Sequence, residues 1–270
     1  MPKKSDLGDL LKEWRGLRRR SQLEVSVDSG ISQRQISFIE SGRSVPSRST
    51  LMNIAAALDI PLRERNVLLL AAGYAPLYSN AAWNSGEMKS INRALQRVIA
   101  QHEPYPAIVM DRYWNVLLTN SAAPRFFGCF VDMSARTSPR NMLHLIFDPK
   151  GMRPFIANWQ SLAEAMVQRV YRETVGHIVD QQTKDLVASL LAYPDVQSDW
   201  RASETTGASP MIPMSFVKDG AVMNYFSLLT TVGTPQTIAA QEIRVECMYP
   251  ADDETEVLHA QLLAASSTRH

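Results

Sequence analysis

The chain has 270 residues, which corresponds to one or two domains of ordinary size. Hydrophobic residues make up 45% of it, enough for a normal core and too many for a disordered chain. The net charge of +1 excludes a uniformly basic nucleic-acid coat, but the charges are unevenly placed. Residues 1–73 carry a net charge of +4, whereas residues 74–270 carry −3. The basic front end predicts an anionic partner for that part of the chain.

The sequence contains neither an apolar leader nor a run of about 18 apolar residues. We therefore expect a cytoplasmic protein without a membrane span. Cys129 and Cys247 are too few for a disulfide framework and fit small buried hydrophobic residues better. The histidines show no metal-ligand spacing, and no nucleotide-binding or nucleophile-elbow motif occurs, so neither a metal site nor catalysis is predicted.

Helical periodicity dominates the front end of the chain. Ser21 and Ser32 are expected N-caps, each with a polar residue three places on, Glu24 and Gln35, and Gly30 supplies the turn between two short helices. The expected helices cover residues 7–20, 22–29, 32–41, 47–58 and 61–73. The side chains expected to face inward from the second and third helices are Leu23, Val27, Ile36 and Ile39.

Two short helices joined by a glycine turn form the pattern of a helix-turn-helix. The third helix carries Gln33 and Arg34 near its start. A glutamine at this place can form two hydrogen bonds with adenine, and an arginine can do so with guanine. The alternative is a surface helix whose polar side chains only meet water, and the residue types by themselves leave both interpretations open.

The spacing of several further residues resembles the Xre/Cro-type helix-turn-helix over about residues 7–60. The residues that carry the resemblance are Ser21-Gln22, Gly30-Ile31-Ser32-Gln33, Ile36-Ser37, Ile39-Glu40-Ser41-Gly42-Arg43 and Pro46-Ser47. The sequence departs from that family at Ser26 and Ser29, where alanines are usual. The resemblance implies a structural ion pair between Arg15 and Glu40. The DNA-contacting residues that it implies are Gln22, Ser32, Gln33, Arg34, Ser37, Phe38, Arg43, Ser44 and Arg48.

Residues 74–104 are expected to form a linker followed by a connecting helix. Residues 74–86 have the polar, proline- and glycine-containing composition of a connector. Apolar side chains then follow heptad-like spacing from Met88 to His102. This stripe either packs on its own domain or forms a seam between two chains, and it is too short to indicate a coiled coil.

The remaining chain, residues 105–263, reads as an α+β domain with an antiparallel sheet of the PAS kind. Period-two patterns predict strands, and longer periodic segments predict helices. The expected strands cover residues 107–110, 114–118, 214–217, 221–231 and 238–249. The expected helices begin at Asn120 and cover residues 154–175 and 183–192. An acidic run at 252–256 fits a solvated loop or a helix start, and residues 264–270 are expected to be a disordered tail.

This domain resembles the ligand-binding domain of MmyB-like transcription regulators. The residues that carry the resemblance are Asp111-Arg112-Tyr113-Trp114-Asn115-Val116, Asn120, Ala122-Ala123, the run from Asn141 to Pro149, Arg153-Pro154, Asn158-Trp159 and Trp200. The segment 62–76 also resembles the joint that this family has behind its helix-turn-helix. Ser209-Pro210 stands where the family often has a His-Pro sequence.

The resemblance implies a pocket for a small apolar, fatty-acid-like molecule. Aromatic and methionine side chains are abundant here, but such stripes also build ordinary cores. Arg153 is a candidate for binding a carboxylate head group, with a surface helix start as the alternative. The candidate ligand-binding residues are Trp114, Asn120, Phe126, Phe127, Phe147, Arg153 and Trp159.

Together these observations predict a transcription regulator with a helix-turn-helix in residues 1–73. We expect it to bind a double-stranded operator as a homodimer and to respond to a small effector. The alternative is a ligand-independent regulator whose second domain only dimerises or binds a protein partner. An enzyme tethered to DNA is a third reading, which the lack of a catalytic motif disfavours.

Overall fold

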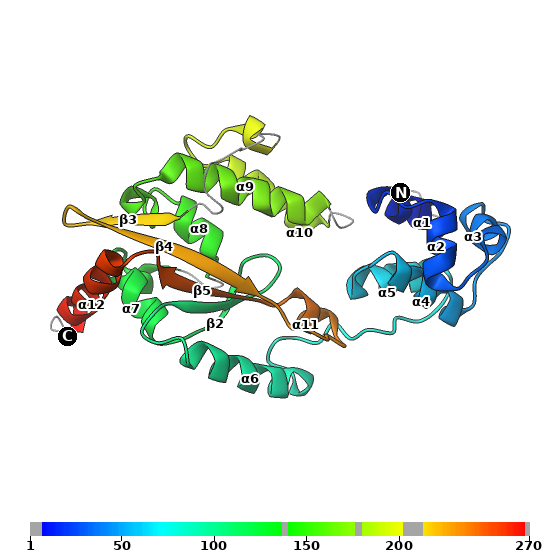
Figure 1. The fold of residues 1–270 in the computed structure, drawn as a ribbon, viewed down its shortest axis with the longest axis horizontal. Coiled ribbons are helices and arrows are strands. Elements are labelled where there is room, and N and C mark those ends of the chain that lie inside the picture. The colour runs from blue at the N-terminus through cyan, green and yellow to red at the C-terminus, as the bar shows by residue number, and fades with distance from the viewer. Residues whose placement is uncertain (1–6, 137–139, 176–179, 202–212, 268–270) are drawn as a thin grey trace. The chain divides into compact units, whose positions relative to one another are not determined.

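The structure, a computed structural model, describes residues 7–136, 140–175, 180–201 and 213–267. The chain divides into two compact units. The first unit holds the described residues up to Ala81 together with residues 234–241, and the second holds the other described residues. Figure 1 labels the helices and strands of each unit.

The described part of the first unit has the predicted N-terminal arrangement of five helices. They are α1 (Leu7–Leu17), α2 (Gln22–Ser29), α3 (Gln33–Glu40), α4 (Arg48–Ala57) and α5 (Leu62–Ala71). Each helix contributes at least one side chain that is almost completely buried: Trp14, Val25, Ile39, Leu51 and Leu69. The five helices therefore close around one hydrophobic core, as the inward periodicity requires.

The prediction that Leu23 and Val27 face inward from α2 is wrong. Leu23 and Val27 are 58% and 74% exposed, whereas Val25 between them is completely buried. A helix of eight residues has room for more than one apolar stripe, and contacts with α3 and α4 decide which stripe faces the core. Ser29, one of the departures from the family pattern, donates a hydrogen bond from its hydroxyl to the carbonyl of Val25 at 2.6 Å.

Among the described residues of the second unit, five strands form one antiparallel sheet in the order β2-β1-β5-β4-β3, which is PAS-like. They are β1 (Ala107–Met110), β2 (Val116–Thr119), β3 (Met214–Lys218), β4 (Ala221–Thr230) and β5 (Arg244–Pro250). The first hairpin pairs with β5, the last strand of the chain, so that β5 lies in the centre of the sheet. The predicted α+β fold with an antiparallel sheet is confirmed.

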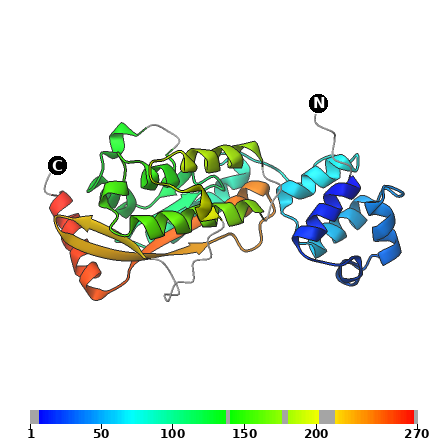
Figure 2. The ribbon, with the colours of Figure 1, turned by 90° about the horizontal axis from the view of Figure 1, so that it is seen from above.

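Helices lie on the sheet of the second unit (Figure 1, and from above in Figure 2). The helices here and in the β4–β5 connection are α6 (Lys89–Ala100), α7 (Ala122–Gly128), α8 (Met142–Phe147), α9 (Trp159–Val175), α10 (Gln181–Leu191), α11 (Ile238–Glu242) and α12 (Asp253–Ser267). Short 3-10 turns are η1 (Gly86–Met88), η2 (Met133–Ala135), η3 (Arg153–Phe155) and η4 (Ser198–Arg201). The main core contains Met166 from α9, Phe216 from β3 and Met248 from β5.

Three boundaries differ from the expectation. The helix expected at 154–175 is divided into η3 and α9, because Ile156 between them forms a bridge with Phe216. The strand expected at 238–249 begins as α11 and continues as β5. Helix α12 extends to Ser267, past the expected start of the tail, and residues 268–270 lie outside the described part of the chain.

The heptad-like stripe of α6 belongs mainly to its own domain. Leu95 and Ile99 are buried, and the helix packs against β1 and β2. Val98 is 49% exposed. The stripe was expected either to pack on its own domain or to form a seam between two chains. Packing within the domain accounts for its buried side chains.

Candidate functional site

The turn between α2 and α3 is held by local hydrogen bonds. The backbone N–H of Glu24 donates to the Ser21 hydroxyl at 3.2 Å, and the N–H of Ser21 donates to the Glu24 carboxylate at 2.7 Å. Gly30 has a φ of 70°, which a glycine adopts without strain. The Ser32 side chain then accepts from the N–H of Gln35 at 3.3 Å and caps α3. These interactions aim the first turn of α3 away from the core.

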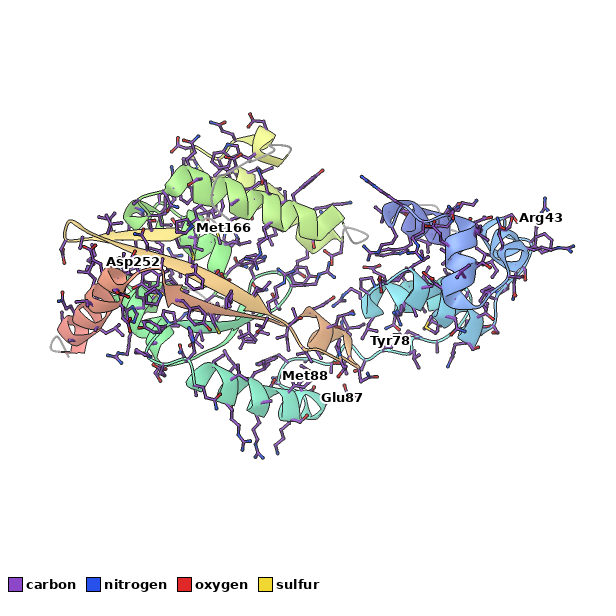
Figure 3. All side chains as sticks on the ribbon, viewed as in Figure 1. Arg43, Tyr78, Glu87, Met88, Met166 and Asp252 are labelled. Carbon is purple, nitrogen blue, oxygen red and sulfur yellow. The ribbon has the colours of Figure 1, made fainter. Side chains whose placement is uncertain are left out.

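The outer face of α3 presents the predicted base-reading side chains. Gln33 and Arg34 are exposed, and Ser37 is half-buried. Phe38 lies near two guanidinium groups, whose central carbons are 5.3 Å (Arg34) and 6.0 Å (Arg43) from the ring centroid. Arg43 extends outward from the loop after α3 (Figure 3). Phe38 thus contacts two arginines through its ring.

The loop between α3 and α4 places further polar groups beside this face. The carbonyl of Phe38 accepts hydrogen bonds from the N–H groups of Arg43 and Ser44, at 2.8 and 3.2 Å. The Arg48 guanidinium lies 5.5 Å from the ring centroid of Tyr74, whose hydroxyl donates to the carbonyl of Pro46 at 2.9 Å. An aromatic ring therefore supports Arg48, as Phe38 supports the other two arginines.

Glu40, at the end of α3, forms the ion pair with Arg15 that the resemblance implies. The Nε and Nη2 atoms of Arg15 donate to the two carboxylate oxygens at 2.7 and 3.0 Å. Gln22 donates from Nε2 to the same carboxylate at 2.8 Å, a contact that the sequence analysis did not foresee. Burial acts to raise the pKa of Glu40, but the hydrogen bonds from Arg15 and Gln22 outweigh it and lower the pKa overall. The pair orients Gln22 as well as holding α1 against α3.

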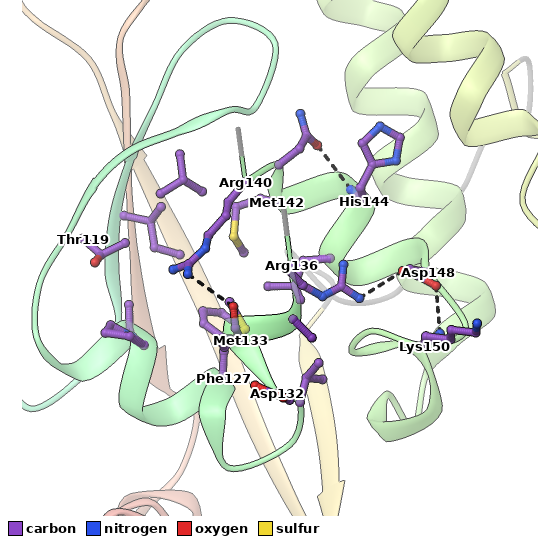
Figure 4. A pocket seen from close by; sticks show the side chains of 18 residues that line it. Thr119, Phe127, Asp132, Met133, Arg136, Arg140, Met142, His144, Asp148 and Lys150 are labelled. Atoms are coloured by element: carbon purple, nitrogen blue, oxygen red, sulfur yellow. Dashed lines mark hydrogen bonds and ion pairs between the residues drawn. The ribbon is translucent and has the colours of Figure 1, made fainter. Parts of the chain in front are cut away.

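A pocket of about 560 Å³ lies in the second unit (Figure 4). Most of its wall is apolar and comes from β1, β2, α7, α8 and the segment between the two helices: Ile108, Val116, Ala123, Pro124, Phe127, Val131, Met133, Ala135, Met142 and Leu145. Its polar lining consists of Thr119, Asp132, Arg136, Arg140, Asn141, His144, Asp148 and Lys150. An apolar wall with a few polar groups is typical of a site for a small organic molecule, and such sites measure about 300–1,000 Å³.

The polar lining gathers three cationic side chains and two acidic ones. Arg136 pairs with Asp148, Nη2 to Oδ2 at 3.0 Å, while its Nε is buried without a hydrogen-bond partner among the described residues. Arg140 donates from Nη2 to the carbonyl of Met133 at 3.2 Å. The ring of His144 contacts the Tyr193 hydroxyl at 2.9 Å, and burial lowers the pKa of this histidine. The guanidinium groups can receive an anion.

The ligand-binding residues predicted from the sequence are only partly brought together. Phe127 lines the pocket, and Trp114 lines a smaller void beside it. Asn120 is buried and bonds to backbone, its Oδ1 accepting from the N–H of Ala107 at 3.0 Å. Phe126 and Phe147 are fully buried in aromatic clusters away from the pocket lining.

Arg153, the candidate head-group receptor, also lies outside the pocket lining. Its guanidinium pairs with Asp195, donates to the carbonyl of Pro194 at 2.8 Å and lies 4.7 Å from the Trp159 ring centroid. These contacts engage the Arg153 guanidinium and the Trp159 ring. The arginines at the pocket are Arg136 and Arg140 instead.

Residues 91–262 match the family described as MmyB-like transcription regulator ligand binding domain. The chain belongs to the MmyB-like transcription regulators. Residues 11–65 of this regulator match a helix-turn-helix family. It is also 29% identical over 115 residues to the uncharacterized HTH-type transcriptional regulator RghRB of Bacillus subtilis (strain 168), covering 42% of this chain and 81% of that protein. The MmyB-like regulator is therefore a helix-turn-helix, DNA-binding transcriptional regulator with a ligand-binding domain, and its families are regulators rather than enzymes.

Two further properties concern the part of this MmyB-like regulator that the structure describes. No group of histidine, cysteine, aspartate and glutamate side chains there has the arrangement of a metal site. No helix there combines the length and the apolar character needed to cross a membrane.

Arg136, Arg140 and His144 line the pocket of the regulator but were not predicted as ligand-binding residues from its sequence. Arg136 and Arg140 follow the second strand in a segment without a clear hydrophobic period, so no helix or strand pattern assigned them a face. His144 lies in the apolar run 142–147, which fits a core or boundary histidine. The mostly polar run 132–140, which holds both Arg136 and Arg140, was a usable signal. Gly151 also belongs to the site's construction, because a Cβ there would lie 2.7 Å from Nη2 of Arg136.

Proposed function

We propose that the MmyB-like regulator binds a palindromic operator as a homodimer and that a fatty-acid-like effector in the 560 Å³ pocket modulates this binding. The observation that carries the DNA-binding part is the exposed start of α3, with Gln33 and Arg34 beside arginines supported on aromatic rings. In a homodimer, two such helices would enter successive major grooves about 34 Å apart.

We assign base reading to the first turns of α3. Gln33 binds adenine and Arg34 binds guanine, while Ser32 and Ser37 contact neighbouring polar edges. Phe38 packs against a thymine methyl group. Contacts with phosphate come from the side chains that flank this face: Gln22, Arg43, Ser44 and Arg48. Phosphate contacts position the protein, and base contacts specify the sequence.

A pair of substitutions tests this division. Gln33→Ala should cost about 1–3 kcal/mol on the cognate operator at one base position and leave non-specific binding unchanged. Arg48→Ala should weaken binding to all sequences and reduce the slope of log affinity against log salt by about one. Fluorescence anisotropy with operator and scrambled duplexes measures both. If Gln33→Ala reduces the affinity for the operator and for the scrambled duplex equally, Gln33 does not read a base.

We place the anionic end of the effector at Arg136 and Arg140 and its apolar body along the pocket wall. Arg140 is exposed, and its guanidinium meets only a backbone carbonyl among the contacts that the structure gives it. A charged hydrogen bond contributes about 1.5–3 kcal/mol. Arg140→Gln should therefore reduce the affinity for dodecanoic acid at least about tenfold, as measured by calorimetric titration. Arg97→Gln on α6, exposed and outside the pocket lining, should leave the affinity unchanged.

The alternative, a ligand-independent regulator, makes a different prediction. Solvent extraction of the purified protein followed by mass spectrometry should release a stoichiometric amphiphile if the pocket holds an effector. An empty protein that also fails to bind dodecanoic acid would favour a second domain that only dimerises. Sedimentation with and without operator tests the dimer itself.

A further inference from the structure

Glu246 is a buried carboxylate in an otherwise apolar void of the ligand-binding domain. It lies on the central strand β5, opposite Ile108 of β1, and is 8% exposed. Among the described residues that line this void, it is the only charged one. The neighbours that matter here are Trp114, Met142, Met166, Met214 and Met248.

No described residue donates a hydrogen bond to the Glu246 carboxylate or forms an ion pair with it. The contrast with Glu40 is large, since that buried carboxylate is held by Arg15 and Gln22. An unpaired carboxylate in an apolar environment is destabilising, so its retention calls for an interaction partner. Arg169 and Arg244 lie near this region, at 4.6 and 5.7 Å from the centroid of the Trp114 ring, and both have further contacts.

The void adjoins the 560 Å³ pocket. Ile108, Phe127 and Met142 line both, so these three side chains separate the two spaces. As it stands, the void has room for about one water molecule. Methionine side chains change rotamer at low cost, and methionines form much of its wall. A ligand that displaces Met142 would extend from the arginines at the pocket into contact with Glu246.

We propose that Glu246 receives a hydrogen-bond donor at the far end of the effector, a hydroxyl or a protonated amine. The inference rests on the proposed ligand-binding function and narrows its ligand class. The effector is an elongated molecule with an anionic end at Arg136 and Arg140, an apolar middle and a donor group at the opposite end. A simple fatty acid would instead place a methyl group against the unpaired carboxylate.

Calorimetric titration of the full chain with three matched acids tests the proposal. The probes are dodecanoic acid, ω-hydroxydodecanoic acid and ω-aminododecanoic acid. The two acids that carry a donor should bind at least about tenfold more tightly than dodecanoic acid, because a hydrogen bond to a charged group contributes about 1.5–3 kcal/mol. Trp114 lies in the void wall, so these two acids should also change the tryptophan fluorescence more strongly.

Variants at Glu246 make the test specific. Glu246→Met should reverse the order, with dodecanoic acid binding most tightly. Glu246→Gln should still bind ω-hydroxydodecanoic acid more tightly than dodecanoic acid, because the amide oxygen accepts a hydrogen bond. It should no longer bind ω-aminododecanoic acid more tightly than dodecanoic acid, because the negative charge is gone. Glu254→Gln, exposed on α12, is the matched control and should leave all three affinities unchanged.

The outcomes separate this inference from the function on which it rests. Equal affinities for the three acids, unchanged by Glu246→Met, would overturn the role of Glu246 and leave the fatty-acid-like effector standing. Binding of none of the three acids would overturn both. Preference for the donor-bearing acids that survives in Glu246→Met would place the donor elsewhere in the pocket and would also overturn the inference.

Discussion

At the scale of single residues, His259 on α12 is held by a hydrogen bond at each nitrogen of its ring. It is 1% exposed, with Nε2 3.0 Å from the carbonyl of Pro104 and Nδ1 2.8 Å from the hydroxyl of Tyr225. The carbonyl can only accept, so Nε2 donates to it and Nδ1 accepts from Tyr225. Burial lowers the pKa of His259. The ring is therefore neutral, in one tautomer, and joins α12 to the sheet.

This arrangement predicts the pH dependence of stability. The unfolded chain, with a histidine pKa near about 6.5, binds the proton more readily than the folded protein. The contribution of His259 is complete above about pH 6.5 and decreases as the pH falls towards the lower, folded-state pKa. Urea unfolding by near-ultraviolet circular dichroism should give a smaller free energy at about pH 5.5 than at about pH 7.5. His259→Gln, which keeps a donor and an acceptor, should weaken this difference, and an unchanged difference would refute the assignment.

At the scale of elements, a close contact helps to position α3, the helix that carries Gln33 and Arg34, against α1. Gly8 of α1 meets the end of α3 so closely that a Cβ there would lie 2.4 Å from the carbonyl oxygen of Glu40. That separation is far below van der Waals contact. The ion pair of Arg15 with Glu40 joins the same two helices.

Gly8→Ala should therefore force α1 and α3 apart. Overpacking of this kind costs about 1–3 kcal/mol and should lower both the melting temperature and the operator affinity. Gly16→Ala is the matched control on the same helix, since a Cβ there meets nothing within 4 Å. It should stabilise the helix by up to about 1 kcal/mol. Calorimetry of the two variants separates packing from helix propensity, and equal effects would argue against the close contact.

At the scale of the whole molecule, we expect the β4–β5 connection to couple effector binding to the helix-turn-helix. Residues 234–241 belong to the first unit, although they connect two strands of the sheet. Within that unit, Gln241 accepts from the N–H of Leu62 at 2.7 Å, and the Ile238 N–H donates to the carbonyl of Ser79 at 2.9 Å. Gln241 thus caps α5, whose first residues have no side-chain cap of their own.

Gln241→Ala should uncap α5 and weaken the coupling between effector and operator. Loss of a cap costs about 0.5–2 kcal/mol of stability. If the coupling free energy is about 1–3 kcal/mol, the effector changes operator affinity about 5–150-fold in the wild type and less in the variant. Gln236→Ala, exposed in the same connection, is the control. Anisotropy titrations with and without effector measure the ratio, and an unchanged ratio in Gln241→Ala would rule out this route.

The sequence by itself determined the parts of this protein that depend on neighbours a few residues apart. The capping serines Ser21 and Ser32, the turn at Gly30 and the period-two strands involve such short-range interactions, so their residue types predict them. The two families were recognisable for the same reason, because their motifs are local.

Only the tertiary structure decided which side chains meet across long separations in the chain. It buried Val25 instead of Leu23, engaged Arg153 with Asp195 and brought Arg136 and Arg140 to the pocket. It also placed Glu246 of the last strand in an apolar void. These outcomes depend on competition among many packing and ion-pair contacts of similar energy, and a periodic pattern along the chain does not rank them.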